Sequence, residues 1–308
     1  MRGRSRGSVH GVGFAVCFAL AVLAAACGGG GGSSSNNSKN YRAITFGNGQ
    51  FVAVGTDGII ATSSDGRKFQ QGASGVDVVL NGVIFATGRY VVTGDLATIL
   101  TSPDGLAWTP ESAPTNVSLQ DVTYGNGLYV AVGYTGTILT STDGRTWQTE
   151  TSGTLRALRG VTFGDGRFVA VGDSGTILTS TDARAWSAVS SGTAQALNRV
   201  LSAAGRFVAV GFASTIAASD DGLIWSARSE NFANFATLSD VVFARDLFVI
   251  VGTGGVIVTT PDGNRLTEQP SHTSQNLAGV TFGADLFVAV GGDRVVDTSP
   301  DGVSWDVE

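Results

Sequence analysis

The chain has 308 residues, of which only 14% are charged, against about 25% in typical soluble proteins. Glycine supplies 44 residues, about twice its usual share of roughly 7%. The formal net charge is −6 at pH 7, and an acidic surface repels phosphate backbones, so nucleic acid is excluded as an expected partner. Low charge with abundant glycine favours many short strands joined by tight turns.

Residues 1–26 have the features of a lipoprotein signal peptide. Arginines at positions 2, 4 and 6 precede an apolar run, residues 14–26, which is too short to span a bilayer comfortably. Residues 23–27 (LAAAC) resemble the lipobox of bacterial lipoproteins, so we expect cleavage before Cys27 and a lipid on its sulfur. The alternatives are an ordinary secretory signal cut after Ala26 and an uncleaved anchor.

Residues 27–40 follow as a tether rich in glycine, serine and asparagine, which would reach about 20 Å as a random coil. We therefore expect a lipid-anchored protein of the cell envelope. Gly28 replaces the aspartate associated with inner-membrane retention, so an outer-membrane or cell-surface place is expected if the source has two membranes. With Cys17 in the signal and Cys27 lipidated, neither a disulfide nor a cysteine metal site is expected.

Residues 41–308 consist of seven copies of one repeat of about 39 residues. The glycine that ends each VAVG-like segment recurs at intervals of 39 residues, with one interval of 41: Gly55, Gly94, Gly133, Gly172, Gly211, Gly252 and Gly291. The aspartate of the following turn keeps the same spacing: Asp65, Asp104, Asp143, Asp182, Asp221, Asp262 and Asp301. A period this regular indicates a repeat architecture.

Each copy predicts four strands. In the third copy, residues 119–124, 128–132 and 137–141 alternate with glycine turns, and Trp147 begins a fourth strand. Four antiparallel strands form one propeller blade, and blades must stack to bury their apolar faces. The sequence predicts an all-β, seven-bladed β-propeller, with each blade complete within one repeat and the ring sealed by side-chain packing. An open solenoid and a pair of β-sandwiches fit seven equal periods less well.

The turn after the third predicted strand has the pattern Ser-x-Asp-Gly-x-x-Trp. The aspartate can accept backbone N–H groups, glycine supplies a positive φ, and the tryptophan fills the space between sheets. These tryptophans are Trp108, Trp147, Trp186, Trp225 and Trp305. Because the aspartates recur in every copy, we expect them to be structural. We predict no catalytic residue, no metal site and no cofactor.

This turn resembles the Asp-box of BNR-type propellers. The whole repeat is similar to propellers of the photosystem II assembly-factor type and more distantly to sialidases. The first resemblance implies a protein-binding scaffold, and the second implies a glycoside hydrolase. Against the hydrolase, the Arg-Ile-Pro-like element of sialidases is absent, and Tyr90, Tyr124 and Tyr129 occupy repeat positions that carry phenylalanine elsewhere. A glycan-binding lectin is a further alternative.

Departures from the repeat consensus indicate where a partner could bind. A two-residue insertion between Trp225 and Val241 carries Phe232 and Phe235, which either contact a partner or pack under their own loop. Further candidates, on neighbouring turns and at the starts of first strands, are Phe212, Tyr134, Asp173, Asp121, Arg159, Arg199 and Asp240. Exposed aromatic side chains with a few charges suit a protein contact. The sequence thus predicts a monomeric, non-enzymatic scaffold that binds protein or, alternatively, glycan.

Overall fold

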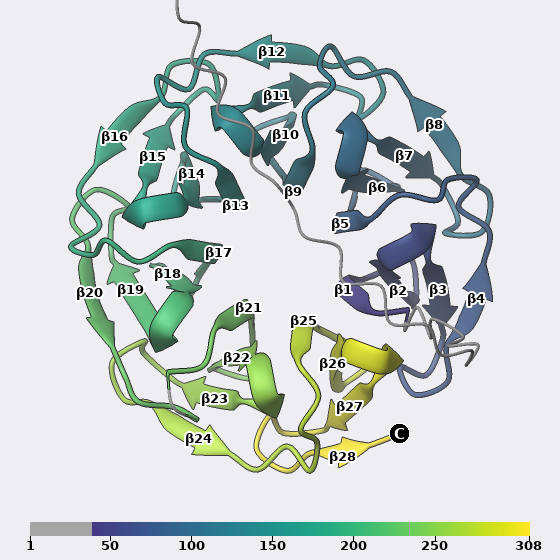
Figure 1. Cartoon of the computed structure of the whole chain (residues 1–308), viewed down its shortest axis with the longest axis vertical. Helices are drawn as coiled ribbons and strands as arrows, with labels where there is room; N and C mark the ends of the chain where they lie inside the picture. The colour runs from purple at the N-terminus through teal and green to yellow at the C-terminus, as the bar shows by residue number, and fades with distance from the viewer. Residues whose placement is uncertain (1–38, 234) are drawn as a thin grey trace, which may run out of the picture. The chain divides into compact units, whose positions relative to one another are not determined.

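The computed structural model describes residues 39–233 and 235–308, which form seven four-stranded antiparallel sheets in a ring (Figure 1). In every sheet the strands follow one another in chain order, with the first strand nearest the central channel (Figure 1). The predicted seven-bladed propeller is therefore confirmed. The predicted signal peptide, the lipidation site Cys27 and all but the last two residues of the tether lie outside the described residues.

Blades 1 to 4 share one pattern of strand lengths. Their strands are β1 (Tyr41–Gly47), β2 (Gln50–Gly55), β3 (Ile60–Ser63), β4 (Gln70–Gly72), β5 (Leu80–Ala86), β6 (Arg89–Gly94), β7 (Ile99–Ser102), β8 (Thr109–Glu111), β9 (Leu119–Gly125), β10 (Leu128–Gly133), β11 (Ile138–Ser141), β12 (Gln148–Glu150), β13 (Leu158–Gly164), β14 (Arg167–Gly172), β15 (Ile177–Ser180) and β16 (Ser187–Val189).

Blades 5 to 7 continue the pattern, with slightly longer third and fourth strands in blade 5 and a shorter fourth strand in blade 7. Their strands are β17 (Leu197–Ala203), β18 (Arg206–Gly211), β19 (Thr215–Ser219), β20 (Ser226–Ser229), β21 (Leu238–Ala244), β22 (Leu247–Gly252), β23 (Ile257–Thr260), β24 (Thr267–Gln269), β25 (Leu277–Gly283), β26 (Leu286–Gly291), β27 (Val296–Ser299) and β28 (Asp306–Val307).

A three-residue 3₁₀ turn follows the second strand of each blade. These turns are η1 (Thr56–Gly58), η2 (Asp95–Ala97), η3 (Tyr134–Gly136), η4 (Asp173–Gly175), η5 (Phe212–Ser214), η6 (Thr253–Gly255) and η7 (Gly292–Arg294). No helix within residues 39–233 or 235–308 has the length and hydropathy needed to cross a bilayer.

The core lies between the blades. The second strand of each blade is buried on both faces, because the blade lies between two neighbouring blades. Successive side chains of the strand point in opposite directions, so they face the two neighbours in turn. In β14, Phe168 and Ala170 pack against blade 3, whereas Val169 and Val171 pack against blade 5. Burying a valine or phenylalanine side chain contributes about 1.5–3 kcal/mol. Each blade is thus held mainly by apolar contact with its two neighbours.

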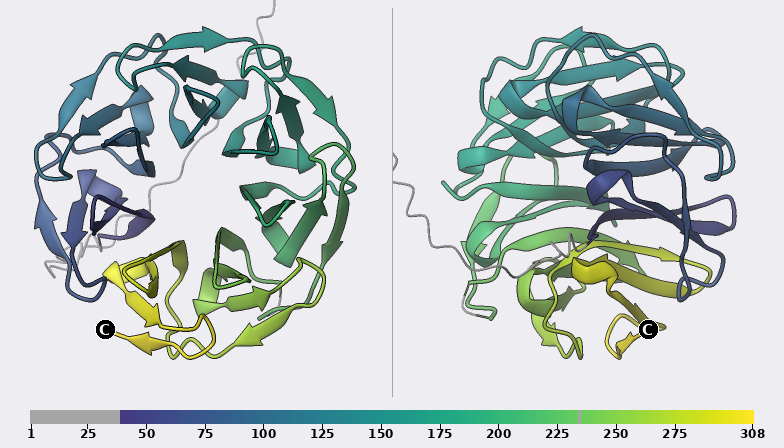
Figure 2. Two further views of the ribbon diagram at one scale, coloured as in Figure 1. Left: turned by 180° about the vertical axis from the view of Figure 1, so that it is seen from behind. Right: turned by 45° about the vertical axis from the view of Figure 1, so that its right-hand side comes forward.

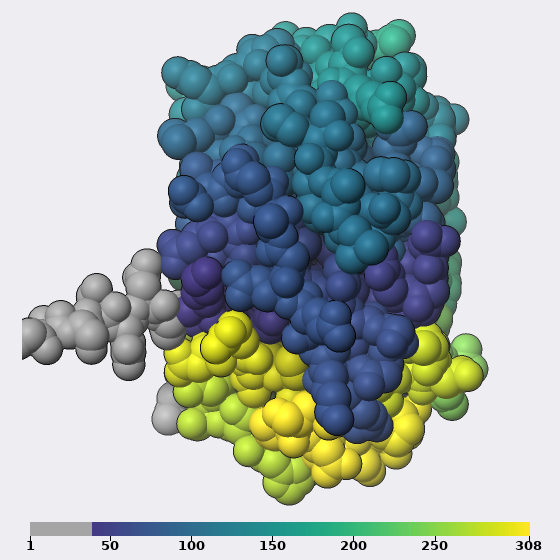
Figure 3. Space-filling view, turned by 90° about the vertical axis from the view of Figure 1, so that its right-hand side faces the viewer, coloured from purple at the N-terminus to yellow at the C-terminus, as the bar shows by residue number. Residues whose placement is uncertain are grey.

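The ring closes without a shared strand, because blades 1 and 7 are separate complete sheets. Tyr41 and Phe51 of blade 1 form one apolar cluster with Val288 and Val290 of blade 7. Figure 3 shows the yellow residues of blade 7 directly against the purple and blue residues of the first blades. The predicted closure by side-chain packing is therefore confirmed.

Close approach of two backbone segments explains the 39-residue glycine period. Gly172 ends β14 in an extended conformation, with φ −172°, that any residue could adopt. A Cβ on Gly172 would, however, lie 2.0 Å from the carbonyl oxygen of Ala157, just before β13. The corresponding distances in all seven blades are 1.9–2.5 Å. The start of each first strand therefore leaves room only for glycine at the end of the second.

The turn after each third strand, here called the Asp-box turn after its sequence pattern, is closed by side-chain hydrogen bonds. In blade 3, Asp143 Oδ1 accepts the backbone N–H groups of Arg145 and Thr146, each at 2.8 Å. Ser141 Oγ donates to the same carboxylate at 3.0 Å and accepts from the N–H of Gly144 at 2.9 Å. The two N–H donors lower the pKa of Asp143, so the carboxylate is charged when the turn is formed.

The same pattern recurs around the ring. Two backbone N–H groups bind one oxygen of each of Asp65, Asp104, Asp143, Asp182, Asp221, Asp262 and Asp301. The indole N–H of each of Trp108, Trp147, Trp186, Trp225 and Trp305 donates to the carbonyl of the turn residue three positions earlier. Each of these tryptophans also packs against the buried aromatic of its own second strand, with ring centroids 6.2–6.5 Å apart. The aspartate carboxylates are thus occupied in closing turns.

Candidate binding site at the channel mouth

One face of the ring, here called the channel-mouth face, carries the seven η turns and the starts of the seven first strands. Backbone hydrogen bonds join the two sets: Tyr134 N donates to Ser118 O at 3.1 Å, and Phe212 N donates to Ala196 O at 2.9 Å. The third strand of each blade runs away from its η turn, so the Asp-box turns lie on the opposite face (Figure 2).

A β-bulge occupies the second position of every first strand. In β9, Leu119 pairs with Gly133 and Asp121 pairs with Val132, so Gln120 is left out of the ladder. The same shift of register occurs in all seven blades. Bulges redirect a side chain away from the regular alternation of a strand. Each blade therefore presents one redirected side chain at the same level along the channel axis.

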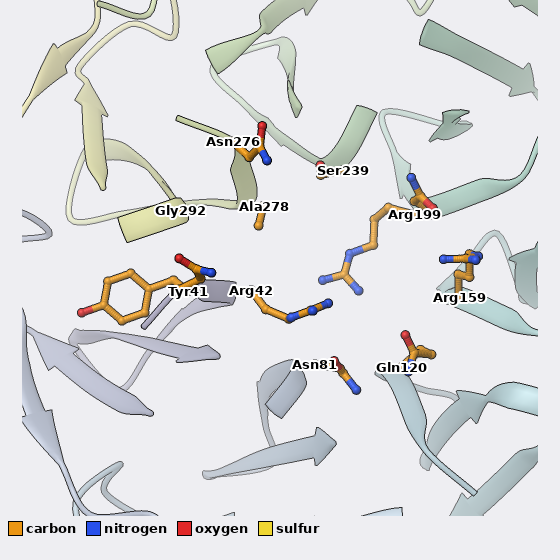
Figure 4. Close-up of a pocket in the computed structure, with 12 residues that line it drawn as sticks. Tyr41, Arg42, Asn81, Gln120, Arg159, Arg199, Ser239, Asn276, Ala278 and Gly292 are labelled. Carbon is orange, nitrogen blue, oxygen red and sulfur yellow. The ribbon is translucent and has the colours of Figure 1, made fainter. Parts of the chain in front are cut away.

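All seven bulged residues line one pocket at the mouth of the channel (Figure 4). They are Arg42, Asn81, Gln120, Arg159, Asn198, Ser239 and Ala278. The remaining lining residues are Asn40, Tyr41, Arg199, Asn276 and Gly292. The pocket has a volume of about 330 Å³, near the lower end of the roughly 300–1,000 Å³ typical of small-molecule sites. Guanidinium and amide groups dominate its wall.

The three arginines of the pocket differ in how their charge is balanced. Arg159 Nε donates to Asp173 Oδ1 at 2.5 Å, and its guanidinium lies 5.7 Å from the centre of the Phe212 ring. Arg199 binds two buried carboxylates. Arg42 is exposed, and no carboxylate of the described residues lies within 4.0 Å of its guanidinium. Figure 4 shows its side chain extending toward the middle of the pocket.

Arg199 and its two carboxylates form a buried triad just below the pocket. Arg199 of blade 5 forms ion pairs with Asp121 of blade 3 and with Asp240 of blade 6, the latter with Nε at 2.8 Å from Oδ1. Both aspartates are 4% exposed. Between them, Gly160 of blade 4 lies close to the backbone of blade 5, because a Cβ there would lie 2.9 Å from the Cα of Arg199.

The triad also ties the inner edges of other blades. Asp121 Oδ2 accepts the N–H of Val161 in blade 4, and Asp240 Oδ2 accepts the N–H of Val280 in blade 7, each at 2.9 Å. Burial by itself would lower the pKa of Arg199, but the two carboxylates outweigh it and hold the guanidinium charged. Burial raises the pKa of Asp121, and Arg199 opposes that shift. The triad therefore links blades 3 to 7 around the channel.

The amide side chains at the pocket each form hydrogen bonds within the protein through only some of their polar atoms. Asn81 Nδ2 donates to Leu119 O at 3.0 Å, and Asn198 Nδ2 donates to Leu238 O at 2.8 Å, so both reach the next blade. Asn276 Oδ1 accepts the N–H of Gly254 at 2.9 Å. These hydrogen bonds do not use the carbonyl oxygens of the first two amides or the NH₂ group of Asn276.

The structure separates the charged residues among the predicted contacts into two groups. Arg159 and Arg199 line the pocket, with Asp173 bound to Arg159. Asp121 and Asp240 lie buried beneath it, where they hold Arg199 rather than face a partner.

The predicted aromatic contacts also divide. Tyr134, Phe212 and Phe235 are 42%, 40% and 55% exposed. Phe232 packs against the apolar cluster between blades 5 and 6, as the alternative interpretation of that loop expects.

Sequence reasoning missed most of the pocket wall, namely Arg42, Asn81, Gln120, Asn198 and Ser239. The available signal was positional: each follows the apolar residue that begins a first strand, and these positions vary in side chain from copy to copy. Alternation alone assigns them to one side of the sheet. The bulge, which turns them into the channel, has no signature in the side chains themselves.

Two features bear on enzymatic alternatives. Tyr41 lines the pocket beside three arginines, but it is 5% exposed and its ring extends away from the pocket (Figure 4). Burial raises the pKa of Tyr41, which Arg294 opposes only in part, whereas a tyrosine nucleophile needs a lowered pKa. Within residues 39–233 and 235–308, no group of three or more histidine, cysteine, aspartate or glutamate residues is placed to hold a metal ion.

Comparison with known proteins gives structural likeness only. No protein-family profile and no curated protein sequence matches the chain. Similar solved structures include a protein described as YCF48 bound to D1 peptide, with TM-score 0.68, 18% identity, and coverage of 87% of this chain and 93% of that one. YCF48 from Cyanidioschyzon merolae has TM-score 0.66 and 17% identity over 85% of this chain and 95% of its own.

A streptogramin B lyase is also similar, with TM-score 0.75 and 14% identity over 87% of this chain and 93% of the lyase. At these identities the likeness shows the fold and not the activity, because one propeller fold hosts unrelated functions. The predicted likeness to assembly-factor propellers is thus confirmed at the level of the fold. No family profile supports the more specific Asp-box assignment.

Proposed function

We propose that this chain is a non-enzymatic propeller that binds a protein partner on its channel-mouth face, while a lipid on Cys27 holds it at the cell envelope. The observation that carries the proposal is the pocket built by one bulged residue from each blade. Its guanidinium and amide groups form hydrogen bonds in fixed directions, and exposed aromatic side chains lie beside it. A similar fold has been solved with a bound peptide, which supports a protein partner.

Exposed apolar side chains lie on three of the seven η turns of this face. Leu96 on η2, Tyr134 on η3 and Phe212 on η5 are 73%, 42% and 40% exposed. Leu155, 87% exposed, lines a shallow depression together with residues of η3. Protein interfaces combine such apolar and aromatic contacts with a few directional polar groups. The arrangement suits a peptide or loop lying across the mouth of the channel.

Site-specific photo-crosslinking in intact cells tests this assignment of the face. A benzophenone side chain would replace Tyr134 or Phe212 on the channel-mouth face, and Leu106 or Ile224 on the Asp-box turns of the opposite face. We expect a discrete protein adduct from the first pair and none from the second. Equal adducts from both faces, or adducts from the Asp-box turns alone, would contradict the proposal.

The lipid anchor is tested separately with Cys27→Ser. We expect the unchanged chain to enter the detergent phase of a Triton X-114 extract and to incorporate labelled palmitate, and the variant to do neither. A variant that still incorporates palmitate would exclude Cys27 as the anchor.

A sialidase-like hydrolase is the second candidate, favoured by three arginines and a tyrosine at one pocket. The buried Tyr41 and the carboxylates already bound to Arg159 and Arg199 weigh against it. Hydrolysis of a fluorogenic sialoside that is lost in Tyr41→Phe would establish this candidate in place of a binding module.

A further inference from the structure

The charge balance of the pocket selects one residue as the anchor for a ligand. Arg159 and Arg199 are held by Asp173 and by the buried triad, so their guanidinium groups already have carboxylate partners. Arg42 has none among the described residues and extends into the pocket (Figure 4). An arginine presents five N–H donors in a planar fork that matches the two oxygens of a carboxylate.

The surroundings of Arg42 favour a peptide carboxylate over a sugar acid. Among the residues that line the pocket, the only aromatic one, Tyr41, is buried, so no ring inside the pocket offers a face on which a sugar could stack; the exposed Tyr134 and Phe212 are not lining residues. The pocket wall instead carries the amides of Asn81, Gln120 and Asn198, which suit the N–H and C=O groups of a peptide backbone. The pocket volume of about 330 Å³ suits one or two residues of such a chain rather than a folded domain.

The apolar side chains next to the pocket indicate which kind of residue should lie beside the carboxylate in a bound peptide. The Phe212 ring lies beside the pocket wall, because its centre is 5.7 Å from the guanidinium of the lining residue Arg159. The backbone N–H of Tyr134 binds Ser118 O, two positions before Gln120, so the η3 turn adjoins the start of β9. Each ring is at least 40% exposed. An extended peptide with its carboxylate on Arg42 can therefore lay a neighbouring apolar side chain against one of them.

We infer that the channel mouth is a carboxylate-recognition site for an extended peptide, with Arg42 binding the carboxylate, the bulge-residue amides binding the peptide backbone, and Tyr134 or Phe212 packing against an adjacent apolar residue. This inference rests on the proposed function and deepens it. The carboxylate can come from an aspartate or glutamate side chain or from a C-terminus, because both present the same two oxygens.

The test uses the purified full chain and a library of random hexapeptides that each contain one phenylalanine or leucine. Four pools are made: with and without aspartate and glutamate, each as free acids and as C-terminal amides. We expect retention of every pool that carries a carboxylate and no retention of the pool that carries none. Which acidic pool is retained most strongly identifies the source of the carboxylate. Binding should weaken as salt increases, because an exposed ion pair is screened.

Arg42→Gln should weaken binding of the retained pools at least about tenfold, as expected for loss of a charge-assisted pair. Arg184→Gln is the matched control, because Arg184 is exposed on an Asp-box turn of the opposite face and its loss changes the net charge equally. The control should bind as the unchanged chain does. Thermal unfolding of both variants verifies that neither change disturbs the ring.

Three outcomes overturn the inference. Retention of the pool without carboxylates, or equal weakening by Arg42→Gln and Arg184→Gln, excludes carboxylate recognition by Arg42. Arg42-dependent binding of a panel of uronic-acid oligosaccharides with no peptide retained assigns the site to glycans. If no pool is retained while photo-crosslinks still form from Tyr134, the channel-mouth face binds protein by other contacts, so the proposed function stands and the inference fails.

Discussion

Asp297 should make the stability of the ring depend on pH in a direction opposite to that of most carboxylates. It lies in β27 opposite Ala289, at a position that carries alanine, leucine or valine in the other six blades. The residue is 0% exposed, and neither carboxylate oxygen has a hydrogen-bond partner among the described residues. Burial raises the pKa of Asp297 to about 7, an effect that Asp306 and Glu308 reinforce and the Thr298 N–H opposes.

The magnitude follows from the difference between the folded and unfolded pKa values. The unfolded value is close to 3.8 and the folded value about 7, a gap of about 3 pKa units, and each unit corresponds to about 1.4 kcal/mol. Below about pH 4 both states are protonated, so ionisation of the residue costs no stability. Between about pH 4 and pH 7 the unfolded state ionises first, so stability falls as pH rises. Above about pH 7 the full cost of about 4 kcal/mol remains.

The test measures urea unfolding of the unchanged chain and of Asp297→Asn by tryptophan fluorescence from pH 4 to pH 9. Asparagine has nearly the same shape and cannot ionise. We expect Asp297→Asn to gain about 4 kcal/mol relative to the unchanged chain between pH 4 and pH 8. Asp297→Leu, which copies blades 2 to 4, should be the more stable variant at pH 8 because it also removes an unsatisfied polar group.

Asp306→Asn is the matched control, because Asp306 is exposed on the neighbouring strand β28. It should leave the pH dependence nearly unchanged. The reasoning is refuted if Asp297→Asn and the unchanged chain lose stability in parallel from pH 4 to pH 8.

Three further predictions concern the channel and the repeat. Arg199→Met should destabilise the ring by about 3–5 kcal/mol in urea unfolding at pH 8, because Asp121 and Asp240 stay buried without a countercharge. The triple variant that also carries Asp121→Ala and Asp240→Ala should regain most of that stability. An equal loss of stability in the single and triple variants would argue against the triad. Gly172→Ala should lower the unfolding free energy by about 3 kcal/mol, because the new Cβ would clash with Ala157 O. Gly166→Ala, at φ +74° with no atom near the new Cβ, should lower it by only about 1–2 kcal/mol. Similar losses of stability in the two variants would contradict the close approach at Gly172. Phe232→Ala should lower the unfolding free energy by about 1–3 kcal/mol, because its ring packs in the apolar cluster between blades 5 and 6. Phe235→Ala, at an exposed ring, should change the unfolding free energy by no more than about 0.5 kcal/mol and should instead reduce crosslinking on the channel-mouth face. A larger loss of stability from Phe235→Ala than from Phe232→Ala would show that Phe235 is the ring that packs in the core.

The fold was accessible from the sequence because its determinants repeat. Glycine ends each second strand since no Cβ fits beside the next backbone segment, as at Gly172, and this requirement recurs in every blade. The Asp-box recurs for the same reason, since each turn needs a carboxylate such as that of Asp143 to bind two N–H groups. Seven copies of one local constraint make the period, and the period predicts the ring.

The site was less accessible because its determinants do not repeat. The bulge turns Arg42 and Gln120 into the channel, but their identities differ from blade to blade, so nothing in the period selects them. The partnership of Arg199 with Asp121 crosses an intervening blade, and no repeat pattern links the two residues. The sequence therefore predicts exposed positions for Asp121 and Asp240, whereas the closed ring buries both.

The seven bulges separate two requirements that are usually coupled in a binding protein. A bulged residue lies outside the strand ladder, and the neighbours that pack the blades together lie one position away on either side. Substitutions at Gln120 or Ser239 can therefore alter what the channel mouth recognises while the interblade core stays intact. The same ring could acquire new ligands one blade at a time, except where the bulged side chain also binds the next blade, as Asn81 and Asn198 do.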